Sequence, residues 1–551
     1  MPRPRGQAGT PATVTVESPT LAAVTAPSSA EHARLGALAP LAHRLFLVLF
    51  VAQLVSNVGT WMQSVGAVWL MGDLGGSPLL IASVQTASSL PVFVVGIFAG
   101  SLADIFDRRR LLLVTQTWML LAAALLAALT AVGATRPWSL LGCTFALGLG
   151  AALNGPAWQA IQPSLVPAEE FPQAVTLGSA SVNIGRAIGP AFGGVIVAAS
   201  GPAAVFAVNA VSFVAVLVAL ASWHAAPAVS TSRERLWRAT RAGFRYSRHA
   251  RRFRSTLGRS MLYLVPASAV MAMLPLVVRN RLHLGSGSYG ALLAVFGLGA
   301  ISATVVLPAL RQRLSADRIL ELASLAIAGT LAAMALSDQP VVIGAALFVG
   351  GLGWLAALTT FNVTTQRSVP DWVRARGLGL YLFAMQGSVA AGSTAWGATA
   401  SSVGVTPALL IAGAALLIGA AVGRSLPLDA GPELALAVVS DVWPEPTTLL
   451  GADRGPTMVS IAYRVHPDQV DAFIIAMRRL EHARHRTGAN RWTLWRDPAH
   501  PDQFIEQWEV DSWVEHLRQH ERVTETDHQI QTAVNDLLAE PAQVRHFVAE
   551  P

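Results

Sequence analysis

The pattern of apolar positions along the chain predicts a membrane protein that crosses the bilayer many times. A membrane-spanning helix needs about 20 apolar residues, and a backbone in lipid must satisfy its own hydrogen bonds, which favours helices. Twelve such stretches are present, at 46–71, 78–103, 111–132, 138–160, 174–199, 203–222, 257–278, 289–309, 317–336, 341–364, 377–400 and 406–425. The sequence therefore predicts an all-α membrane part made of two six-helix bundles, at 44–222 and 257–426.

The segments outside these stretches have a different character. Residues 1–43 are rich in Ala, Pro, Ser and Thr and contain no apolar run of the signal-peptide type, which predicts a disordered tail. A basic linker, 223–256, separates the bundles, and a Pro-containing linker, 427–457, follows the second bundle. Residues 458–551 are polar and have no membrane-length stretch, so they predict a small soluble domain.

The soluble domain has a recognisable order of elements. Alternating residues predict strands at 458–464, 491–496, 503–510 and 544–548, and helical spacing predicts helices at 468–486, 512–519 and 526–538. Ser512 with Glu515 three residues later is typical of a helix N-cap. With the consecutive helices 512–519 and 526–538 counted as one helical segment, the β-α-β-β-α-β order predicts a ferredoxin-like α+β fold.

Composition supports membrane insertion and excludes several chemistries. Apolar residues make up 53% of the chain and charged residues 13%, against roughly 25% charged in ordinary globular domains. Every one of the 39 basic residues is Arg. The absence of Lys argues against a phosphate-binding P-loop or a Schiff base, and therefore against ATP-driven pumping by this chain. The single Cys143 excludes an internal disulfide.

The distribution of Arg predicts the orientation. Loops on one side hold most of the cationic residues, and the opposite loops hold only Arg136, Arg279 and Arg281. The positive-inside rule then places both termini in the cytoplasm of a multi-pass protein of the inner (plasma) membrane. The Arg-rich segment 233–254 is either a basic helix lying along lipid headgroups or a solvated linker. Its position between spans argues against nucleic acid as a partner.

The two halves are related by an internal repeat. A shift of 203 residues aligns Gly148-Leu149-Gly150 with Gly351-Leu352-Gly353, and Val166-Pro167 with Val369-Pro370. Six spans followed by six similar spans in the same orientation form a parallel repeat. Transporters place their substrate site between such repeats, near the middle of the bilayer.

Two motifs in the first bundle combine small residues with charge. After the second span, Gly100 and Asp104 precede Arg108 and Arg109, a pattern that can latch two bundles through a carboxylate–Arg pair. The alternative is a capping Asp beside a positive-inside loop. In the fifth span, Gly185, Gly189 and Gly193 form one smooth stripe for helix packing, with Pro190 and Gly194 beside it.

These motifs resemble known signatures of the major facilitator superfamily. The first resembles its loop 2–3 signature, and the second is similar to the span 5 signature of its proton-coupled exporters. The stretches 56–63, 154–160 and 166–167 narrow the resemblance to the enterobactin-exporter-like branch, the transmembrane secretion effectors. This resemblance implies a proton-coupled exporter of an organic molecule, such as a drug, antibiotic or siderophore, that works by alternating access and needs no cofactor.

Polar residues inside spans are costly in lipid, so they are candidates for the substrate pathway. Two triplets spaced by four residues each line one helix face. The candidates are Gln53, Asn57 and Trp61; Asn154, Trp158 and Gln162; and Gln85, Asn183, Asn209, Asn362 and Gln386. The alternative for each Asn or Gln is a hydrogen bond between helices, and for each Trp a place at the membrane interface.

Arg186 is a stronger candidate because a charge in mid-span costs several kcal/mol without water or a partner. No Asp or Glu lies in the middle of any predicted span, while Asp73, Asp104 and Glu321 lie at span ends. Arg186 therefore either attracts an anionic substrate or pairs with a span-end carboxylate. The missing central carboxylate leaves the proton carrier unassigned.

The soluble domain provides the competing hypothesis. It resembles the dimeric α+β barrel of antibiotic-biosynthesis monooxygenases, notably over 512–520. The alternative to a transporter is thus a membrane-anchored enzyme or ligand sensor, and the resemblance implies a homodimer through this domain. His516 and His520 have a spacing that suits a metal, but no further ligand is evident, so no metal is predicted. Trp492, Trp495 and Trp508 are expected in a core or a small pocket.

Overall fold

A computed structural model describes residues 36, 38–105, 107–223, 246–426, 428 and 456–549; the side chains of 96–105, 371 and 375 are not part of this description. Most of the predicted tail, the basic linker up to residue 245 and residues 429–455 of the second linker therefore lie outside the described residues. The alternatives for segment 233–254 stay open for the same reason.

Five helices build the N-terminal half and contain the first six predicted spans. They are α2 (Arg44–Asp73), α3 (Pro78–Ile105), α4 (Arg108–Ala131), α5 (Pro137–Ile161) and α6 (Phe171–Ala221). Short 3-10 turns lie at Ala39–Ala42, Gln162–Ser164 and Ala168–Glu170. The long α6 breaks at Gly201, whose φ of 79° belongs to the region that glycine enters without a steric cost.

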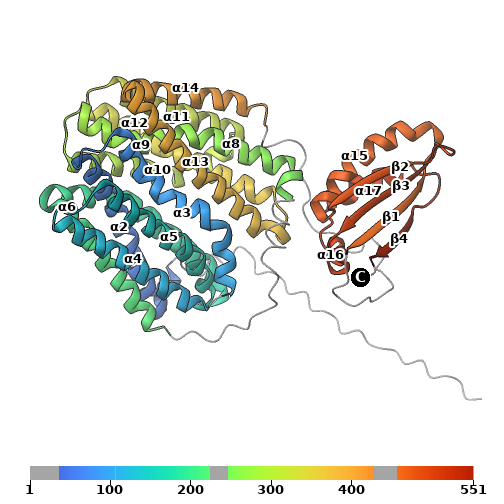
Figure 1. The fold of residues 1–551 in the computed structure, drawn as a ribbon, viewed down its shortest axis with the longest axis horizontal. Helices are drawn as coiled ribbons and strands as arrows, with labels where there is room; N and C mark the ends of the chain where they lie inside the picture. The colour runs from blue at the N-terminus through green and yellow to red at the C-terminus, as the bar shows by residue number, and fades with distance from the viewer. Residues whose placement is uncertain are drawn as a thin grey trace, which may run out of the picture.

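The C-terminal half follows the same plan, and the two halves lie side by side (Figure 1). Its first span is assembled from α8 (Arg251–Ala267), α9 (Ala269–Leu276) and the π-helical turn η4 (Val277–Arg281). Pro266 and Pro275, which lack a backbone N–H, stand inside this span. The others are α10 (Ser286–Arg311), α11 (Ala316–Leu336), α12 (Pro340–Arg367), α13 (Arg374–Val403) and α14 (Val405–Gly423), with the 3-10 turn η5 (Asp371–Val373) before α13.

Ten segments of the described chain are long and apolar enough to cross a membrane. One of them, Ala168–Ala221, contains two predicted spans on either side of Gly201. The helix α13 is not among the ten, although it is 30 residues long, and its sequence is rich in Gly, Ser and Thr. The predicted stretches and the observed helices therefore coincide, and the predicted polytopic helical fold is confirmed.

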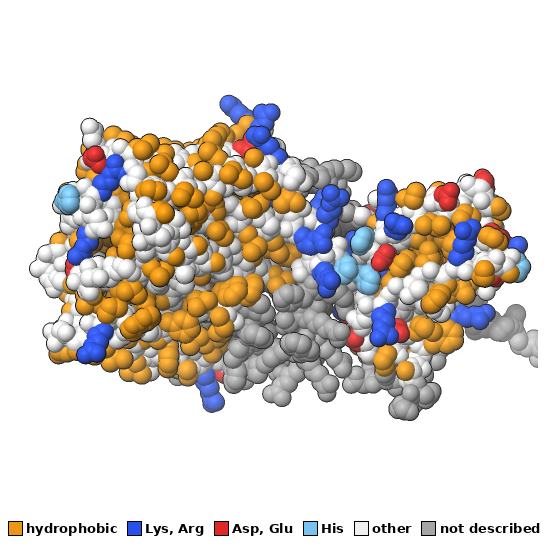
Figure 2. All heavy atoms as spheres, turned by 45° about the horizontal axis from the view of Figure 1, so that its top comes forward, with side chains coloured by type: hydrophobic (Ala, Val, Ile, Leu, Met, Phe, Trp, Pro, Cys, Tyr) orange, Lys and Arg blue, Asp and Glu red, His pale blue; other side chains and the backbone are white. Residues whose placement is uncertain are grey.

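Apolar side chains cover the flank of the helical part, whereas Arg side chains lie at its two ends (Figure 2). Inside, the largest cluster of buried apolar residues belongs to the C-terminal half but includes Val65 of α2 and Ala82 of α3. The two halves thus share part of one core.

The C-terminal domain is a four-stranded antiparallel sheet with helices on one face. The strands β1 (Thr457–Arg464), β2 (Arg491–Arg496), β3 (Gln503–Val510) and β4 (Gln543–Val548) pair in the order β2-β3-β1-β4. The helices are α15 (Val470–Thr487), α16 (Trp513–His520) and α17 (Glu525–Asn535). The Ser512 hydroxyl accepts a hydrogen bond from the Glu515 N–H at 3.3 Å, as its sequence predicts. The predicted α+β domain is confirmed; its relationship to the monooxygenases stays a prediction.

Aromatic and cationic side chains join this domain to the C-terminal half. The ring of His249, just before α8, stacks on His485 of α15 with ring centres 4.6 Å apart. The Arg522 guanidinium lies 4.6 Å from the ring centre of Trp372, in the connection between α12 and α13. Figure 2 shows Arg and His side chains gathered where the two parts meet. We call this contact the domain junction.

The glycine stripe of α6 generates a prediction about stability. A Cβ atom on Gly189 would lie 2.6 Å from the Trp61 Cβ, whereas one on Gly142 of α5 would meet nothing within 4 Å. Gly189→Ala should destabilise the protein by about 1–3 kcal/mol through overpacking, and Gly142→Ala should leave it unchanged or stabilise it slightly. Thermal unfolding in detergent measures both. Equal melting temperatures for the two variants would contradict the tight packing of α6.

The domain junction generates a prediction about pH. Burial, followed by the neighbouring His485, His482, Arg248 and Arg254, lowers the pKa of His249 from 6.5 to about 4. Between pH 4 and 6.5, His249 therefore binds a proton when the domain is undocked but not when it is docked, so docking should be complete above pH 6.5 and weaken as the pH falls toward 4. Spin labels on the exposed positions Arg367→Cys and Ile475→Cys, in a Cys143→Ala background, measure the separation. A His249→Asn control should remove the pH dependence; an unchanged distance in the unaltered junction would contradict it.

A candidate substrate pathway at the centre of the bundle

Polar side chains of α2 and α6 meet near the middle of the N-terminal half. The Asn57 side-chain amide donates a hydrogen bond to the Ser181 hydroxyl at 2.9 Å, and the Gln53 side-chain amide donates to the Asn57 Oδ1 at 3.2 Å. Asn183 of α6 bonds only to its own helix, through the Ser179 carbonyl at 3.0 Å. Gln53, Asn57 and Asn183 are half-buried, so part of each remains accessible.

Arg186 lies one turn further along α6, beside Trp61 of α2. Its guanidinium carbon is 5.3 Å from the centre of the indole ring. Its Nε is buried and has no hydrogen-bond partner in the described part of the chain. None of the described carboxylates forms an ion pair with it. A cation–π contact of this kind provides about 0.5–2 kcal/mol, well short of what a paired carboxylate offers, so this arrangement leaves the charge available to an anion.

The glycine stripe fixes α6 against α2 behind this cluster. Cβ atoms on Gly185 and Gly193 would lie 3.0 Å from the Asn57 carbonyl carbon and 2.9 Å from the Met62 Cα. On another side of α6, Gly194 meets Gly290 of α10, where a Cβ would lie 3.0 Å from the Gly290 Cα. The Pro190 carbonyl oxygen also faces Gly290. The helix is therefore packed closely on both halves.

Several predicted pathway residues instead hold helices together. Asn154 is buried and accepts a hydrogen bond from Gln116 of α4 at 3.1 Å, and the buried Asn209 donates to Gln63 of α2. For these two residues the geometry favours the alternative of an interhelical hydrogen bond. Trp158 packs against the apolar cluster that contains Phe46. These side chains serve packing because they face their neighbours within the N-terminal half.

The remaining polar candidates lie apart from Arg186. Gln85 donates to Ser89 of its own helix at 3.2 Å. Asn362 accepts from Gln366 at 2.6 Å. Gln162 is buried just after the end of α5. Gln386 is half-buried on α13, beside Gly387, whose added Cβ would lie 2.5 Å from the Phe93 ring. That position puts Gln386 at the seam between the halves.

The predicted latch can be described only in part. Gly100 and Asp104 fall in the last turns of α3, and their side chains lie outside the described residues. Arg108 donates to the Ala160 carbonyl at 2.8 Å, and Arg109 donates to the Leu220 carbonyl at 3.1 Å. Both guanidinium groups thus satisfy carbonyls at helix C-termini, where cations are favoured. The pairing with Asp104 stays a prediction.

The contacts between the halves gather at one end of the helices. We call the end that carries Asp73, Ser286 and Ser401 the Asp73 end, and the opposite end, with Arg110, the Arg110 end. At the Asp73 end, Arg279 of η4 pairs with Asp73 of α2 at 2.7 Å, and Trp69 stacks on Tyr289 with ring centres 6.3 Å apart. The sequence analysis noted Asp73 and Arg279 separately; only the fold brings them together.

A seam between α3 and α13 continues this closure toward the middle. The Thr86 and Thr394 hydroxyl oxygens are 2.9 Å apart, and the Phe93 and Phe383 rings stack at 4.0 Å. On α10, a Cβ on Gly297 would lie 2.9 Å from the Ala187 Cα, beside Arg186. Among the described side chains, no hydrogen bond, ion pair or aromatic contact joins the halves beyond this level toward the Arg110 end. The polar cluster around Arg186 therefore lies at the level of the last of these side-chain contacts.

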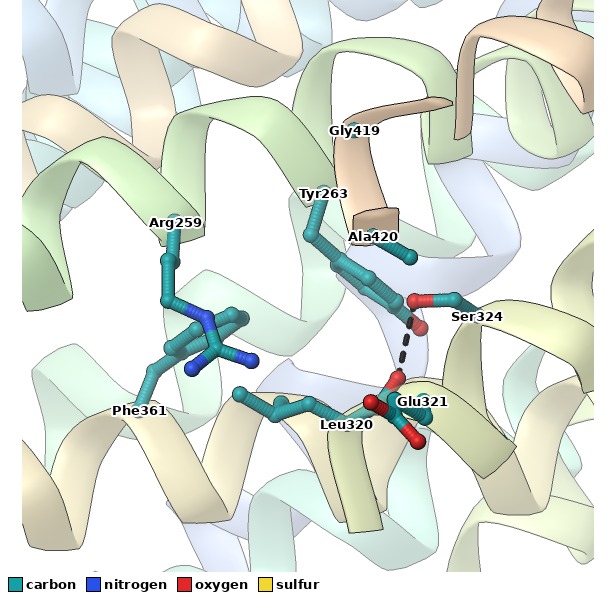
Figure 3. A pocket seen from close by; sticks show the side chains of 8 residues that line it. All are labelled: Arg259, Tyr263, Leu320, Glu321, Ser324, Phe361, Gly419 and Ala420. Atoms are coloured by element: carbon teal, nitrogen blue, oxygen red, sulfur yellow. Dashed lines mark hydrogen bonds between the residues drawn. The ribbon is translucent and has the colours of Figure 1, made fainter. Parts of the chain in front are cut away.

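A small cavity at the Arg110 end of the C-terminal half is too small for a substrate. It measures about 20 Å³, room for about one water molecule. Arg259 and Tyr263 of α8 and Glu321 and Ser324 of α11 line it, and the Ser324 hydroxyl donates to the Leu320 carbonyl at 2.8 Å (Figure 3). Arg259 pairs with Asp317, and Glu321 with Arg424 at 2.8 Å. The first ion pair joins α8 to α11, and the second joins the end of α14 to α11.

The C-terminal domain has a polar core and a histidine cluster. Buried Glu506 accepts hydrogen bonds from Tyr463 at 2.7 Å and Trp492 at 2.8 Å, and pairs with Arg484 at 3.0 Å. Trp508 is buried beside this pair, as expected of a core residue, but Trp495 lies exposed on the open face of the sheet.

The histidines adjoin one another on α16 and β4. The ring of His546 lies 4.7 Å from that of His516, which neighbours His520 at 4.8 Å. The sequence analysis missed His546 because it stands on a distant strand. Burial, together with the adjacent imidazoles, lowers the pKa of His516 to about 3 and that of His520 to about 4, so the rings are neutral at ordinary pH. No metal-binding group of three or more His, Cys, Asp or Glu is found among the described residues.

A family model of the transmembrane secretion effectors matches residues 35–551, which includes the C-terminal domain. The staphyloferrin A transporter of Staphylococcus aureus is 26% identical over 336 residues, 60% of this chain and 84% of the relative. The enterobactin exporter EntS of Citrobacter koseri is 25% identical over 348 residues, 62% of this chain and 81% of the relative. The multidrug efflux pump Tap of Mycolicibacterium fortuitum is 27% identical over 36% of this chain and 50% of the pump.

Solved structures with the same fold are also transporters. A POT family transporter in complex with 5-aminolevulinic acid superposes with a TM-score of 0.57 at 13% identity, covering 70% of this chain and 96% of the other. A bacterial homologue of the human lysosomal transporter Spinster, in an inward-facing unoccupied conformation, gives 0.54 at 14% identity with coverage of 70% and 96%. At these identities the likeness establishes the fold alone.

The seam between α3 and α13 generates a prediction about movement. In a Cys143→Ala background, Thr86→Cys with Thr394→Cys should form a disulfide on oxidation, since their hydroxyl oxygens are 2.9 Å apart. The bond should stop transport by holding the Asp73 end closed, and reduction should restore it. Each single-Cys variant is the control. Full transport by the cross-linked protein would show that the halves need not separate here.

Proposed function

Because this chain belongs to the transmembrane secretion effector family of the major facilitator superfamily, we propose that it exports an organic small molecule by alternating access between its two halves. The family and the relatives are transporters, which confirms the expectation of a membrane transporter rather than an enzyme. Membrane insertion with many spans is equally established, whereas the direction of transport, the substrate and the driving ion belong to the proposal.

The observation that carries the proposal is the unpaired charge of Arg186. A guanidinium stays protonated at any accessible pH, so it has to be stabilised by water, an anion or a partner. Trp61 stacks near it, and Asn57 and Asn183 offer neutral polar groups one or two turns away. These groups suit a substrate that has an anionic group and an aromatic or amide-rich body.

The compounds named for the relatives are compatible with such a substrate. They include siderophore and multidrug transporters, and the proposed substrate is likewise a drug, an antibiotic or a siderophore. Gln53, Asn57, Trp61, Asn183 and Arg186 form the proposed contact surface. Gln85 and Gln386 lie nearer the seam and are proposed to meet the substrate as it passes.

The proposed orientation places the Arg110 end in the cytoplasm. The Arg bias of the loops supports it, and both termini then lie inside. Closure at the Asp73 end would make this conformation open toward the cytoplasm, the state in which an exporter loads its substrate. Release then requires the Asp73–Arg279 pair and the Thr86–Thr394 contact to open while the Arg110 end closes.

We further propose protons as the coupling ion, as the resemblance to proton-coupled exporters implies, without assigning a carrier. The side chain of Asp73 is 45% exposed and forms the ion pair that joins α2 to η4. This pair holds the Asp73 end closed and has to break when that end opens. The latch of Asp104 with Arg108 and Arg109 is proposed to act correspondingly at the Arg110 end.

The C-terminal domain is proposed to join two copies of the chain. On the open face of its sheet, Trp495 pairs with Ile505, and Phe547 lies two strands away; each side chain is more than 40% exposed. Such an apolar sheet face is suited to packing against its own copy. The alternative, a membrane-anchored enzyme, lacks support from the family, whose members are transporters.

The role of Arg186 is tested by charge removal. Arg186→Gln should weaken transport of anionic substrates about tenfold, the value of a charge-assisted hydrogen bond, and affect neutral substrates less than about twofold. Arg186→Lys, which keeps the charge, should retain most transport of the anions. Apparent affinities in vesicles provide the measurement at equal protein level. Equal losses for anionic and neutral substrates would show that Arg186 belongs to the moving scaffold.

A further inference from the structure

A second cavity lies at the domain junction, away from the substrate pathway. It measures about 440 Å³, within the range of about 300–1,000 Å³ typical of small-molecule sites. The start of α8, the connection between α12 and α13 and the end of α14 form one wall, and residues 486–487 and 522–530 of the C-terminal domain form the other. Neither part encloses the space without the other.

The lining of this junction cavity carries an excess of positive charge. Its cationic side chains outnumber its single carboxylate, Asp527, and are Arg251, Arg252, Arg486 and Arg522. Asp527 is already occupied, since it pairs with Arg486 at 2.5 Å and accepts from the Thr524 hydroxyl at 2.7 Å. Arg522 pairs with Glu515 at 2.6 Å. Arg251 is exposed and has no partner among the described residues.

The position of α8 points to the same chemistry. The helix begins at this cavity, where Ala250 and Arg251 belong to the lining. The positive end of the helix dipole therefore lies at the cavity wall, and it favours an anion there.

Apolar surface completes the lining. The Trp372 ring, Pro370 and Leu426 come from the C-terminal half, and Ile530 from α17. Arg522 covers one face of Trp372 at 4.6 Å and keeps that ring in place. The cavity thus offers cationic side chains and the positive end of a helix dipole together with an apolar wall.

We propose that the junction cavity binds a small organic anion, an acidic group on an aromatic or apolar body. The acidic group lies at the start of α8 near Arg251, and the body lies along Trp372. Because both walls are needed, the ligand binds only the docked arrangement and stabilises it by mass action. The C-terminal domain is in this way a sensor whose docking on the transporter reports the anion.

Binding is tested on the full chain in nanodiscs of neutral phosphatidylcholine, with salicylate as the probe and salicylamide as its uncharged analogue. Calorimetry should give salicylate binding at least about tenfold tighter than salicylamide binding. Arg251→Ala should weaken salicylate about fivefold, the effect of one partly exposed charge. Trp372→Ala, which removes the ring along which the body of the ligand lies, should weaken salicylate and salicylamide alike.

The matched control is Arg254→Ala. Arg254 stands on the same turn of α8, is exposed and does not line the cavity, so its loss should leave salicylate binding unchanged. Equal weakening by Arg251→Ala and Arg254→Ala would mean that the overall positive potential at the start of α8, rather than the cavity, attracts salicylate. That result would overturn the proposal. Salicylate dissociation constants above about 10 mM for the unaltered chain would also overturn it.

The substrate pathway is excluded with Arg186→Gln. If that variant abolishes salicylate binding while Arg251→Ala has no effect, the probe binds the pathway and the junction proposal fails. A second measurement follows docking through spin labels at Arg367→Cys and Ile475→Cys in the Cys143→Ala background, and salicylate should shift the label separation toward the docked distance.

The source of the anion is resolved by lipid composition. Nanodiscs that contain phosphatidylglycerol should leave salicylate binding unchanged if the natural ligand is a soluble metabolite, and should compete with it if a lipid headgroup fills the cavity. Both results support an anion site. The proposal is independent of the exported substrate, because binding and docking are measured without transport.

Discussion

The need to stabilise one positive charge inside an apolar bundle organises the centre of this protein. Arg186 cannot become neutral, and its helix is held against α2 by glycines that leave no room for a side chain between the two backbones. That close approach is what brings the Trp61 ring to 5.3 Å from the guanidinium. The glycine stripe and the charge are therefore one arrangement, since a wider spacing would move the aromatic ring out of reach.

Much of the fold could be predicted because its signals are local. Span positions follow from runs of apolar residues. The elements of the soluble domain follow from patterns of alternation or helical spacing that extend over a few residues each. The break at Gly201 lies between the predicted spans 174–199 and 203–222. The exception is α13, which is not among the ten candidate membrane spans because its Gly, Ser and Thr residues lower its mean hydropathy.

The candidate site was less predictable because a polar residue in a span has two uses. Asn57 and Asn154 look alike in sequence, each standing four residues before a Trp. In the structure Asn57 bonds across to α6 beside the unpaired arginine, whereas Asn154 is enclosed against α4. Which neighbour a helix face meets is decided by tertiary packing, as is the meeting of Asp73 with Arg279 across 206 residues of chain.

The two seams between the halves, α6 with α10 and α3 with α13, differ in the contacts that must break when the conformation changes. Where α6 meets α10, backbone faces backbone at Gly194 and Gly290, and the side-chain hydrogen bond there is the long one that the Ser286 hydroxyl donates to the Gly194 carbonyl at 3.4 Å. Where α3 meets α13, the Thr86–Thr394 hydroxyl pair and the stacked Phe93 and Phe383 rings must come apart. A change of conformation therefore breaks more side-chain contacts between α3 and α13 than between α6 and α10. The energetic barrier to the movement of the halves is concentrated at the α3–α13 seam.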